Sequence, residues 1–317
     1  MTNNPLVSIV VCCYNRRHTL EHTMQSVFSQ HYKPVEIVVL DDGSTDSTPD
    51  LIATYGDRVR YNRQENQGIA VTRTNACRLT KGEFIAFQDD DDLMPPQRIS
   101  TLMKALDQYP SAVLAVGDWA FIDSEGNLTG KRSQFKNRID ETELIERSLL
   151  IEDGYTAVLW PCLTPVPHTT LFRRADGERI DWFDPHFFHA CSDTDFFARL
   201  GRLGPIVYVP EIVSYYRYGH SSIWKKKYLS EYSRFLLFEK HLLSLRAEQK
   251  DLRKRLQFRM LQTIKLLAYY SREETKLASL ISKYSLKKGL SLIGIKNQIE
   301  LKLWTLIRLP ILRRRQG

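Results

Sequence analysis

The chain has 317 residues, 43% of them hydrophobic and 26% charged, which is typical of a folded globular protein rather than a fibrous or disordered one. Its net charge of +8 is unevenly distributed: residues 225–317 carry 23 Lys and Arg against 7 Asp and Glu, whereas residues 1–224 have a net charge of −8. This asymmetry predicts an acidic part suited to a metal ion and a basic part suited to the phosphates of a membrane or a nucleic acid.

Cysteine usage and hydropathy restrict the cellular setting. The 5 cysteines are scattered and include no C-x-x-C pair, so neither a disulfide framework nor a zinc site is predicted, and reduced cytoplasmic thiols are the simplest interpretation. We expect no secretory signal, because no basic region precedes the apolar run near the start. We also expect no transmembrane helix, because the stretch 158–172 is short and contains several prolines.

The first 110 residues alternate between strand-like and helix-like segments. Strands are expected at 6–14, 35–44, 58–64 and 83–88, where apolar and β-branched residues form short runs. Helices are expected near 20–28, after Thr48 as N-cap with Pro49 at the first helical position, over 68–82 with Gly82 ending it, and over 95–110. This order predicts an α/β fold with a mostly parallel sheet sandwiched by helices.

Beyond residue 119 the alternation weakens, and from Lys225 the pattern becomes helical. Leu256, Met260, Ile264 and Leu267 recur at helical spacing, which predicts one buried helix face. We therefore expect two domains, an acidic α/β domain over residues 1–224 and a basic α-helical C-terminal region over residues 225–317.

Polar loops follow three of the predicted strands: "CYNRR", "DDGSTD" and "DDDD". Ligands of open α/β sheets bind outside the carboxyl ends of the strands, so these loops should converge on one crevice. The four aspartates Asp89–Asp92 repel one another unless a cation lies among them, and hard Mg²⁺ or Mn²⁺ prefers such oxygen ligands. The alternative is a solvated acidic loop or a helix N-terminus, where acidic residues are also favoured.

Other segments are ambiguous when taken alone. A carboxylate of "DDGS" is suited to a base or a ribose hydroxyl, but an Asp-Gly turn explains it equally well. Asp193 and Asp195 are candidates for a general base, or for the N-terminus of a helix. Arg217 and His220 are candidates for contacts with phosphate or metal, although a surface arginine and a hydrogen-bonded histidine are more common outcomes.

Taken together, six motifs resemble family 2 glycosyltransferases with the GT-A fold. They are "VSIVVCCYNR", "VVLDDGSTDST", "ENQGIAVTRTNA", "GEFIAFQDDDDLMPP", "SDTDFFARL" and "YYRYGHSS", and the resemblance covers roughly residues 5–222. It implies a nucleotide-binding sheet and an inverting transfer of a sugar from a nucleotide donor to an acceptor hydroxyl, using Mg²⁺ or Mn²⁺.

The resemblance also implies roles for individual residues. Tyr14 would line the base pocket and Asp42 would bind the base or ribose. The family's Asp-x-Asp falls on Asp89, Asp90 and Asp91, with Asp91 the main metal ligand and Asp89 beside it. Asp193 matches the catalytic base, although Ser192 stands where many relatives have a glutamate. His220 lies where some relatives place a metal or pyrophosphate ligand.

The implied donor is a nucleotide sugar, expected to be a UDP-sugar, and the implied acceptor is a glycan or a lipid-linked saccharide. The basic tail from about Gly289 onward, with Trp304 among leucines and arginines, favours peripheral binding to the cytoplasmic face of a membrane. No nucleic-acid-binding module is recognisable, so no nucleic-acid partner is expected. The alternative function is that of an inactive nucleotide-sugar-binding or membrane-associated scaffold protein.

Overall fold

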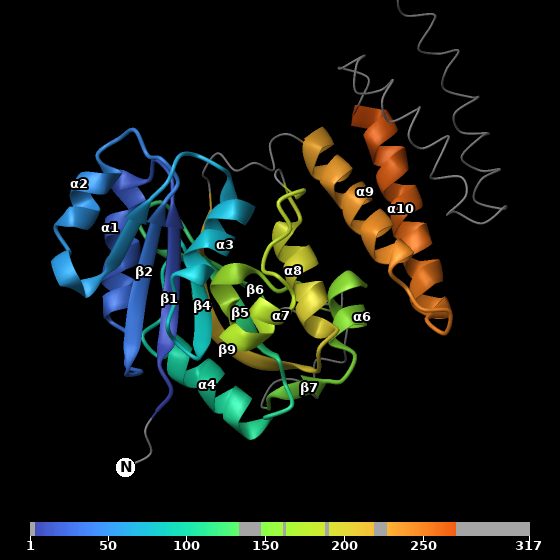
Figure 1. Cartoon of the computed structure of the whole chain (residues 1–317), viewed down its shortest axis with the longest axis horizontal. Helices are drawn as coiled ribbons and strands as arrows, with labels where there is room; N and C mark the ends of the chain where they lie inside the picture. The colour runs from blue at the N-terminus through green and yellow to red at the C-terminus, as the bar shows by residue number, and fades with distance from the viewer. Residues whose placement is uncertain (1–3, 133–146, 161–162, 188–189, 219–226, 271–317) are drawn as a thin grey trace, which may run out of the picture. The chain divides into compact units, whose positions relative to one another are not determined.

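The computed structural model describes residues 4–132, 147–160, 163–187, 190–218 and 227–270 (Figure 1). The chain divides into two compact units, residues 1–188 with 192–220, and residues 189–191 with 221–317.

The first half of the larger unit has the predicted alternation of strands and helices. Its elements are β1 (Val7–Cys13), α1 (Arg17–Phe28), β2 (Val35–Asp41), α2 (Thr48–Ala53), the 3-10 turn η1 (Gly56–Arg58), β3 (Arg60–Arg63), α3 (Ile69–Arg78), β4 (Phe84–Asp89) and α4 (Arg98–Gln108). The strands β3, β2, β1 and β4 are neighbours in that order, and all of their pairings are parallel.

The second half of this unit extends the sheet. Its elements are β5 (Leu114–Ile122), β6 (Leu128–Arg132), β7 (Leu149–Ile151), α6 (Gly154–Leu159), the 3-10 turn η2 (Pro167–Thr169), β8 (Thr170–Arg173), α7 (Arg174–Arg179), α8 (Ser192–Gly201) and β9 (Ile206–Arg217). The full order is β3-β2-β1-β4-β8-β5-β9-β7, with β6 beside β5. Because β8 runs antiparallel to both β4 and β5, the sheet is mixed beyond β4.

Helices cover both faces of the sheet at β1, whose side chains point alternately to one face and the other. Val7, Ile9 and Val11 point into a core shared with α1, α2 and α4, and successive strand residues point to opposite faces. The other face of β1 and β2 packs against α3. These layers explain why all seven residues of β1 are buried.

The sequence predicted that Gly82 ends a helix, and this prediction is wrong. Helix α3 ends at Arg78, and Gly82 instead lies against β1, where its N–H donates to Ser8 Oγ at 2.9 Å. A Cβ atom at this position would lie 2.7 Å from Ser8 N, so glycine is required for close packing rather than as a helix cap.

The described part of the smaller unit, residues 227–270, contains the helices α9 (Lys227–Leu243) and α10 (Lys250–Tyr270), which pack against each other. Leu256, Met260, Ile264 and Leu267 are all buried on α10, as their spacing predicted. Among the described helices, none is long and apolar enough to cross a membrane.

Candidate active site

The carboxyl ends of β1, β2 and β4 lie at one edge of the sheet. In the parallel register Cys13 pairs with Asp41 and Cys12 pairs with Asp89, so the loops that follow these strands start at the same level. The predicted convergence of the "CYNRR", "DDGSTD" and "DDDD" loops is therefore confirmed.

Asp42 orders the loop that leads into α3. Its Oδ1 accepts hydrogen bonds from Gln67 N at 2.9 Å and from Gln64 Nε2 at 2.8 Å, and its Oδ2 accepts one from Gly68 N at 2.9 Å. Gly68 has φ 80°, a backbone conformation that favours glycine. The contact of Asp42 with a base or ribose stays a prediction. Such a contact would have to form in addition to these three hydrogen bonds.

Tyr14 lies on the loop after β1 with 46% of its surface exposed. Its N–H donates to Asp90 Oδ2 at 3.3 Å, which ties this loop to the aspartates. The next residue, Asn15, accepts a hydrogen bond from Thr45 N at 2.7 Å and so joins the first loop to the second. An exposed ring at this place is compatible with the predicted base pocket.

Asp89 forms a tight ion pair with Arg73 of α3. Arg73 Nη2 lies 2.8 Å from Asp89 Oδ1, and the side chain of Arg73 is only 10% exposed. The guanidinium also lies over the rings of Phe87 and Phe183. Burial alone would raise the pKa of Asp89, but attraction from Arg73 and its hydrogen bond outweigh it and hold this pKa below its ordinary value. Asp89 is therefore a carboxylate already compensated by the protein.

Asp90 and Asp91 share one guanidinium, that of Arg16. Arg16 Nε lies 3.6 Å from Asp90 Oδ1, and Arg16 Nη2 lies 3.5 Å from Asp91 Oδ2. Burial, followed by repulsion from Asp91, raises the pKa of Asp90 to about 8, and Arg16 only partly offsets this. With both carboxylates ionised these three groups carry a formal net charge of −1, and a further cation would relieve the repulsion that raises the pKa of Asp90. Asp90 and Asp91, called the outer pair below, are therefore suited to a further cation.

Asp92 does not lie at a helix N-terminus, the alternative that the sequence left open for the four aspartates. The N-cap of α4 is Gln97, and no side chain caps that helix. Asp92 is fully buried, and its Oδ1 accepts a hydrogen bond from Arg217 N at 2.8 Å. Since Leu93 also bridges to Tyr215 of β9, this aspartate anchors the acidic loop to the sheet.

Arg217 takes part in the same anchoring and is not a surface residue, the common outcome named in the sequence analysis. It is buried, and its Nε donates to Asp91 O at 2.9 Å. Its Nη1 donates to Asp123 O at 2.9 Å and to Ser124 O at 2.7 Å. The guanidinium is thus occupied by main-chain oxygens of two loops.

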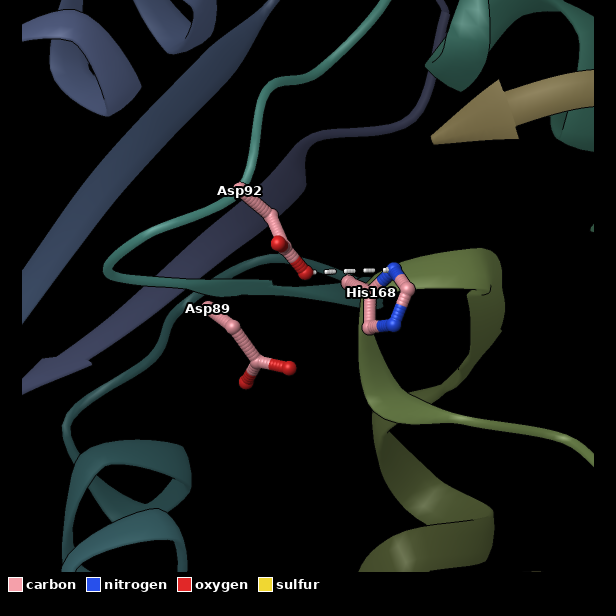
Figure 2. Close-up of side chains that lie close together, drawn as sticks. All are labelled: Asp89, Asp92 and His168. Carbon is pink, nitrogen blue, oxygen red and sulfur yellow. Dashed lines mark ion pairs between the residues drawn. The ribbon is translucent and has the colours of Figure 1, made fainter. Parts of the chain in front are cut away.

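Sequence reasoning missed a cluster formed by Asp89, Asp92 and His168, shown in Figure 2. Each offers one ligand atom within 4.8 Å of the others. His168 Nδ1 lies 3.6 Å from Asp92 Oδ2 and 2.7 Å from Ser214 Oγ. Burial lowers the pKa of His168 to about 4, which keeps the imidazole neutral. Local patterns gave no signal for His168, because it reaches the aspartates only through the antiparallel pairing of β8.

Protein charges offset the two carboxylates of this cluster, although its ligand types would suit a metal. Arg73 pairs with Asp89, and the fully buried Arg98 is attracted by both Asp89 and Asp92. Burial, followed by repulsion from Asp89, raises the pKa of Asp92 well above its ordinary value. We therefore interpret this inner cluster as support for the acidic loop, and the outer pair Asp90–Asp91 as the better cation site.

Asp193 lies in the first turn of α8. Its Oδ1 accepts a hydrogen bond from Thr194 N at 2.8 Å. Burial raises the pKa of Asp193, while Arg73 opposes that shift. Asp195, the other candidate base, is fully buried and pairs with Arg199 at 2.8 Å. Arg73 thus attracts both Asp89 and Asp193, so one guanidinium links the predicted base electrostatically to Asp89 at the end of β4.

Two predicted features lie outside the described residues: the metal ligand His220, and the tail from Gly289 onward. A cavity of about 1000 Å³ lies elsewhere, between α4 and β9, with Lys104, Tyr109 and Glu211 in its lining. Its lining contains none of the predicted site residues. The candidate site is therefore identified by its clustered charges at the carboxyl ends of the strands, and not by this cavity.

Comparisons with solved structures support the fold. S. aureus TarS 1-349 in complex with UDP-GlcNAc matches with a TM-score of 0.67 and 15% identity, covering 92% of this chain and 82% of that one. The mannosyltransferase PcManGT from Pyrobaculum calidifontis, in complex with GDP-Man and Mn²⁺, matches with a TM-score of 0.57 and 16% identity, covering 97% and 81%.

Comparisons of sequence identify the family. The Campylobacter jejuni GalNAc(5)-diNAcBac-PP-undecaprenol beta-1,3-glucosyltransferase is 31% identical over 152 residues, or 46% of this chain and 48% of that protein. Among the first curated relatives, the matched segment spans between 18% and 67% of their length. The model of the glycosyl transferase family 2 matches residues 8–181, more than half of the chain. The chain therefore belongs to glycosyltransferase family 2.

Proposed function

We propose that this protein is an inverting glycosyltransferase that moves a sugar from a nucleotide-diphosphate donor, expected to be a UDP-sugar, to a hydroxyl of a glycan or lipid-linked acceptor. The observation that carries the proposal is the meeting of two strand ends, which bear Asp42 and Asp89–Asp91, at one edge of the sheet. Arg73 pairs there with Asp89 and also attracts Asp193 in the first turn of α8. Nucleotide sugars in two structural neighbours, and a relative named for a PP-undecaprenol substrate, support this choice of donor and acceptor.

A divalent cation fits the outer pair of aspartates. The side chains of Asp90 and Asp91 are 15% and 21% exposed and offer hard oxygen ligands, and when both are ionised they keep a net negative charge beside Arg16. Asp91 would be the main ligand, with Asp90 or Asp89 beside it, and His220 keeps its predicted role. When bound, the cation offsets charge that develops on the leaving diphosphate.

Asp193 is suited to act as the general base. It would take the proton of the acceptor hydroxyl as that oxygen forms a bond to the anomeric carbon of the donor sugar. In the same step the bond from this carbon to the diphosphate oxygen breaks, and attack from the opposite side inverts the configuration. Arg73 assists by favouring the ionised form of Asp193, against the effect of burial.

The basic C-terminal region, residues 225–317, would bring this site to its acceptor at a membrane. Its net charge of +16 suits anionic lipid headgroups, which attract basic residues near the surface. We propose peripheral association with the cytoplasmic face, where a lipid-linked acceptor and a soluble nucleotide sugar can meet.

A screen of UDP- and GDP-sugars for binding and for transfer or hydrolysis, with Mn²⁺ or with EDTA, tests the proposal. We expect much weaker nucleotide binding in EDTA and in Asp91→Ala. Asp193→Asn should bind donor normally but lose about 10²–10⁴-fold in turnover. Asp57→Asn, at an exposed position of η1, serves as the control. Equal nucleotide affinity in Mn²⁺ and EDTA contradicts the role of the metal, and full turnover of Asp193→Asn contradicts the role of the base.

A further inference from the structure

We propose that Arg16 occupies the place of the divalent cation between Asp90 and Asp91, so that guanidinium and cation bind these carboxylates in alternation. The inference deepens the proposed function and rests on it, since it takes the metal site to be at these two aspartates. It assigns Arg16 a role in controlling when the cation binds.

The ion pairs of Arg16 with Asp90 and Asp91 are long and partly exposed, so another cation can replace Arg16 there. Arg16 lies 3.6 Å from Asp90 and 3.5 Å from Asp91, and its side chain is 28% exposed. Arg73, in contrast, lies 2.8 Å from Asp89 with a side chain only 10% exposed. Water competes strongly for exposed charges at the longer separation, so the contacts of Arg16 are the weaker ones.

Charge favours the exchange of Arg16 for a divalent cation. With both carboxylates ionised, one guanidinium between Asp90 and Asp91 leaves a formal charge of −1, whereas a divalent cation neutralises both carboxylates. Mg²⁺ bonds directly to carboxylate oxygens at about 2.1 Å, closer than a guanidinium nitrogen can approach. Two positive groups on the same carboxylates also repel each other, so Arg16 has to move when the cation binds.

The position of Arg16 gives the released side chain a second use. Arg16 is the N-cap residue of α1, on the loop directly after β1, at the strand edge where the other candidate ligands gather. A guanidinium displaced there can form bidentate hydrogen bonds with a phosphate. The diphosphate of the donor would thus stabilise the conformation in which the cation is bound, so cation and donor bind cooperatively.

The first measurement uses Mn²⁺ alone, titrated into cation-free protein at low ionic strength and followed by electron paramagnetic resonance. Arg16→Gln should bind Mn²⁺ about three- to tenfold more tightly than wild type, because a competing cation is gone. Arg17→Gln is the matched control: Arg17 Nη1 pairs with Glu21 Oε2 at 3.1 Å, so this variant removes the same charge from the next position. We expect its Mn²⁺ affinity to stay within about twofold of wild type.

The second measurement uses UDP or GDP at saturating Mn²⁺. Here Arg16→Gln should bind the nucleotide about tenfold more weakly, opposite in sign to its effect on the metal alone. A purely structural role of Arg16 would weaken both. Arg16→Lys keeps the charge but cannot span both carboxylates with a planar fork, so it should lie between wild type and Arg16→Gln for Mn²⁺.

Unchanged or weaker Mn²⁺ binding by both Arg16 variants overturns the inference, as does an equal increase in Arg16→Gln and Arg17→Gln. If Arg16→Gln fails to fold, Arg16→Lys decides the matter by the same criterion. Asp91→Asn separates the two proposals. Undiminished Mn²⁺ binding by this variant refutes the proposed metal site itself, whereas lost binding there with unchanged binding in the Arg16 variants refutes only the exchange.

Discussion

Replacing Arg98 by methionine should destabilise the protein by about 3–5 kcal/mol, the range for removing one partner of a buried ionic network. Arg98 is fully buried on α4. Its Nη1 donates to Gln88 Oε1 at 3.0 Å, and its Nη2 donates to Phe87 O at 2.8 Å and Thr170 O at 3.2 Å. Methionine fills much of the same volume but has no donor, so buried acceptors of two segments lose a hydrogen bond.

The loss also reaches the acidic loop, because Arg98 attracts both Asp89 and Asp92. Without it, two carboxylates in a buried setting lose part of their compensating charge. We therefore expect Arg98→Met to weaken Mn²⁺-dependent binding of the nucleotide as well as stability.

Urea unfolding followed by tryptophan fluorescence measures the effect on stability. With a slope of about 3 kcal/mol per molar urea, the midpoint of Arg98→Met should fall by about 1–2 M. Lys104→Met, at an exposed position of the same helix, should change the free energy of unfolding by no more than about 0.5 kcal/mol. A midpoint for Arg98→Met equal to that of Lys104→Met would refute the reasoning.

The remaining predictions concern pH and the tail. Burial raises the pKa of Asp92 well above its ordinary value, so there is a pH range in which the folded protein holds a proton there and the unfolded chain has lost it. Urea titrations in EDTA should therefore find wild type gaining stability relative to Asp92→Asn as the pH falls from 7 toward 4, and a constant difference contradicts this. Because burial also raises the pKa of Asp193, the acidic limb of kcat/KM should lie above the ordinary aspartate value of about 3.9 and should vanish in the residual rate of Asp193→Asn; a limb at that value in wild type counts against this base. In flotation assays, a chain truncated after Lys288 should lose binding to anionic vesicles, and high salt should weaken binding of the intact chain, since basic residues contribute roughly 1 kcal/mol each. An intact chain that ignores such vesicles at low salt argues against membrane binding.

Much of the first half of the fold could be predicted from sequence because its signals are local. Apolar runs of strand length followed by polar loops place the ends of β1, β2 and β4, and parallel pairing of consecutive units then brings those ends together. Gly82 was misassigned because glycine suits both a helix end and a close approach of two chain segments. Only the packing against Ser8 distinguishes these uses.

The charge balance of the site could not be predicted, because it depends on pairings between distant segments. Arg98 lies in a helical pattern next to polar residues, and nothing local indicates its burial. Its partners and His168 come together only because β8 inserts antiparallel between β4 and β5. Arg16 likewise looks like an ordinary loop arginine until β1 and β4 are neighbours.

The run of four aspartates is uniform in sequence but not in space. Asp89 faces Arg73, Asp90 and Asp91 face Arg16, and Asp92 is fixed to β9. Because the four residues are identical, a sequence alignment can match them one position out of register. The anchoring role of Asp92 would then be assigned to a residue that binds the cation. Equivalence with relatives therefore has to be assigned from the partner that each carboxylate contacts, not from its place in the run.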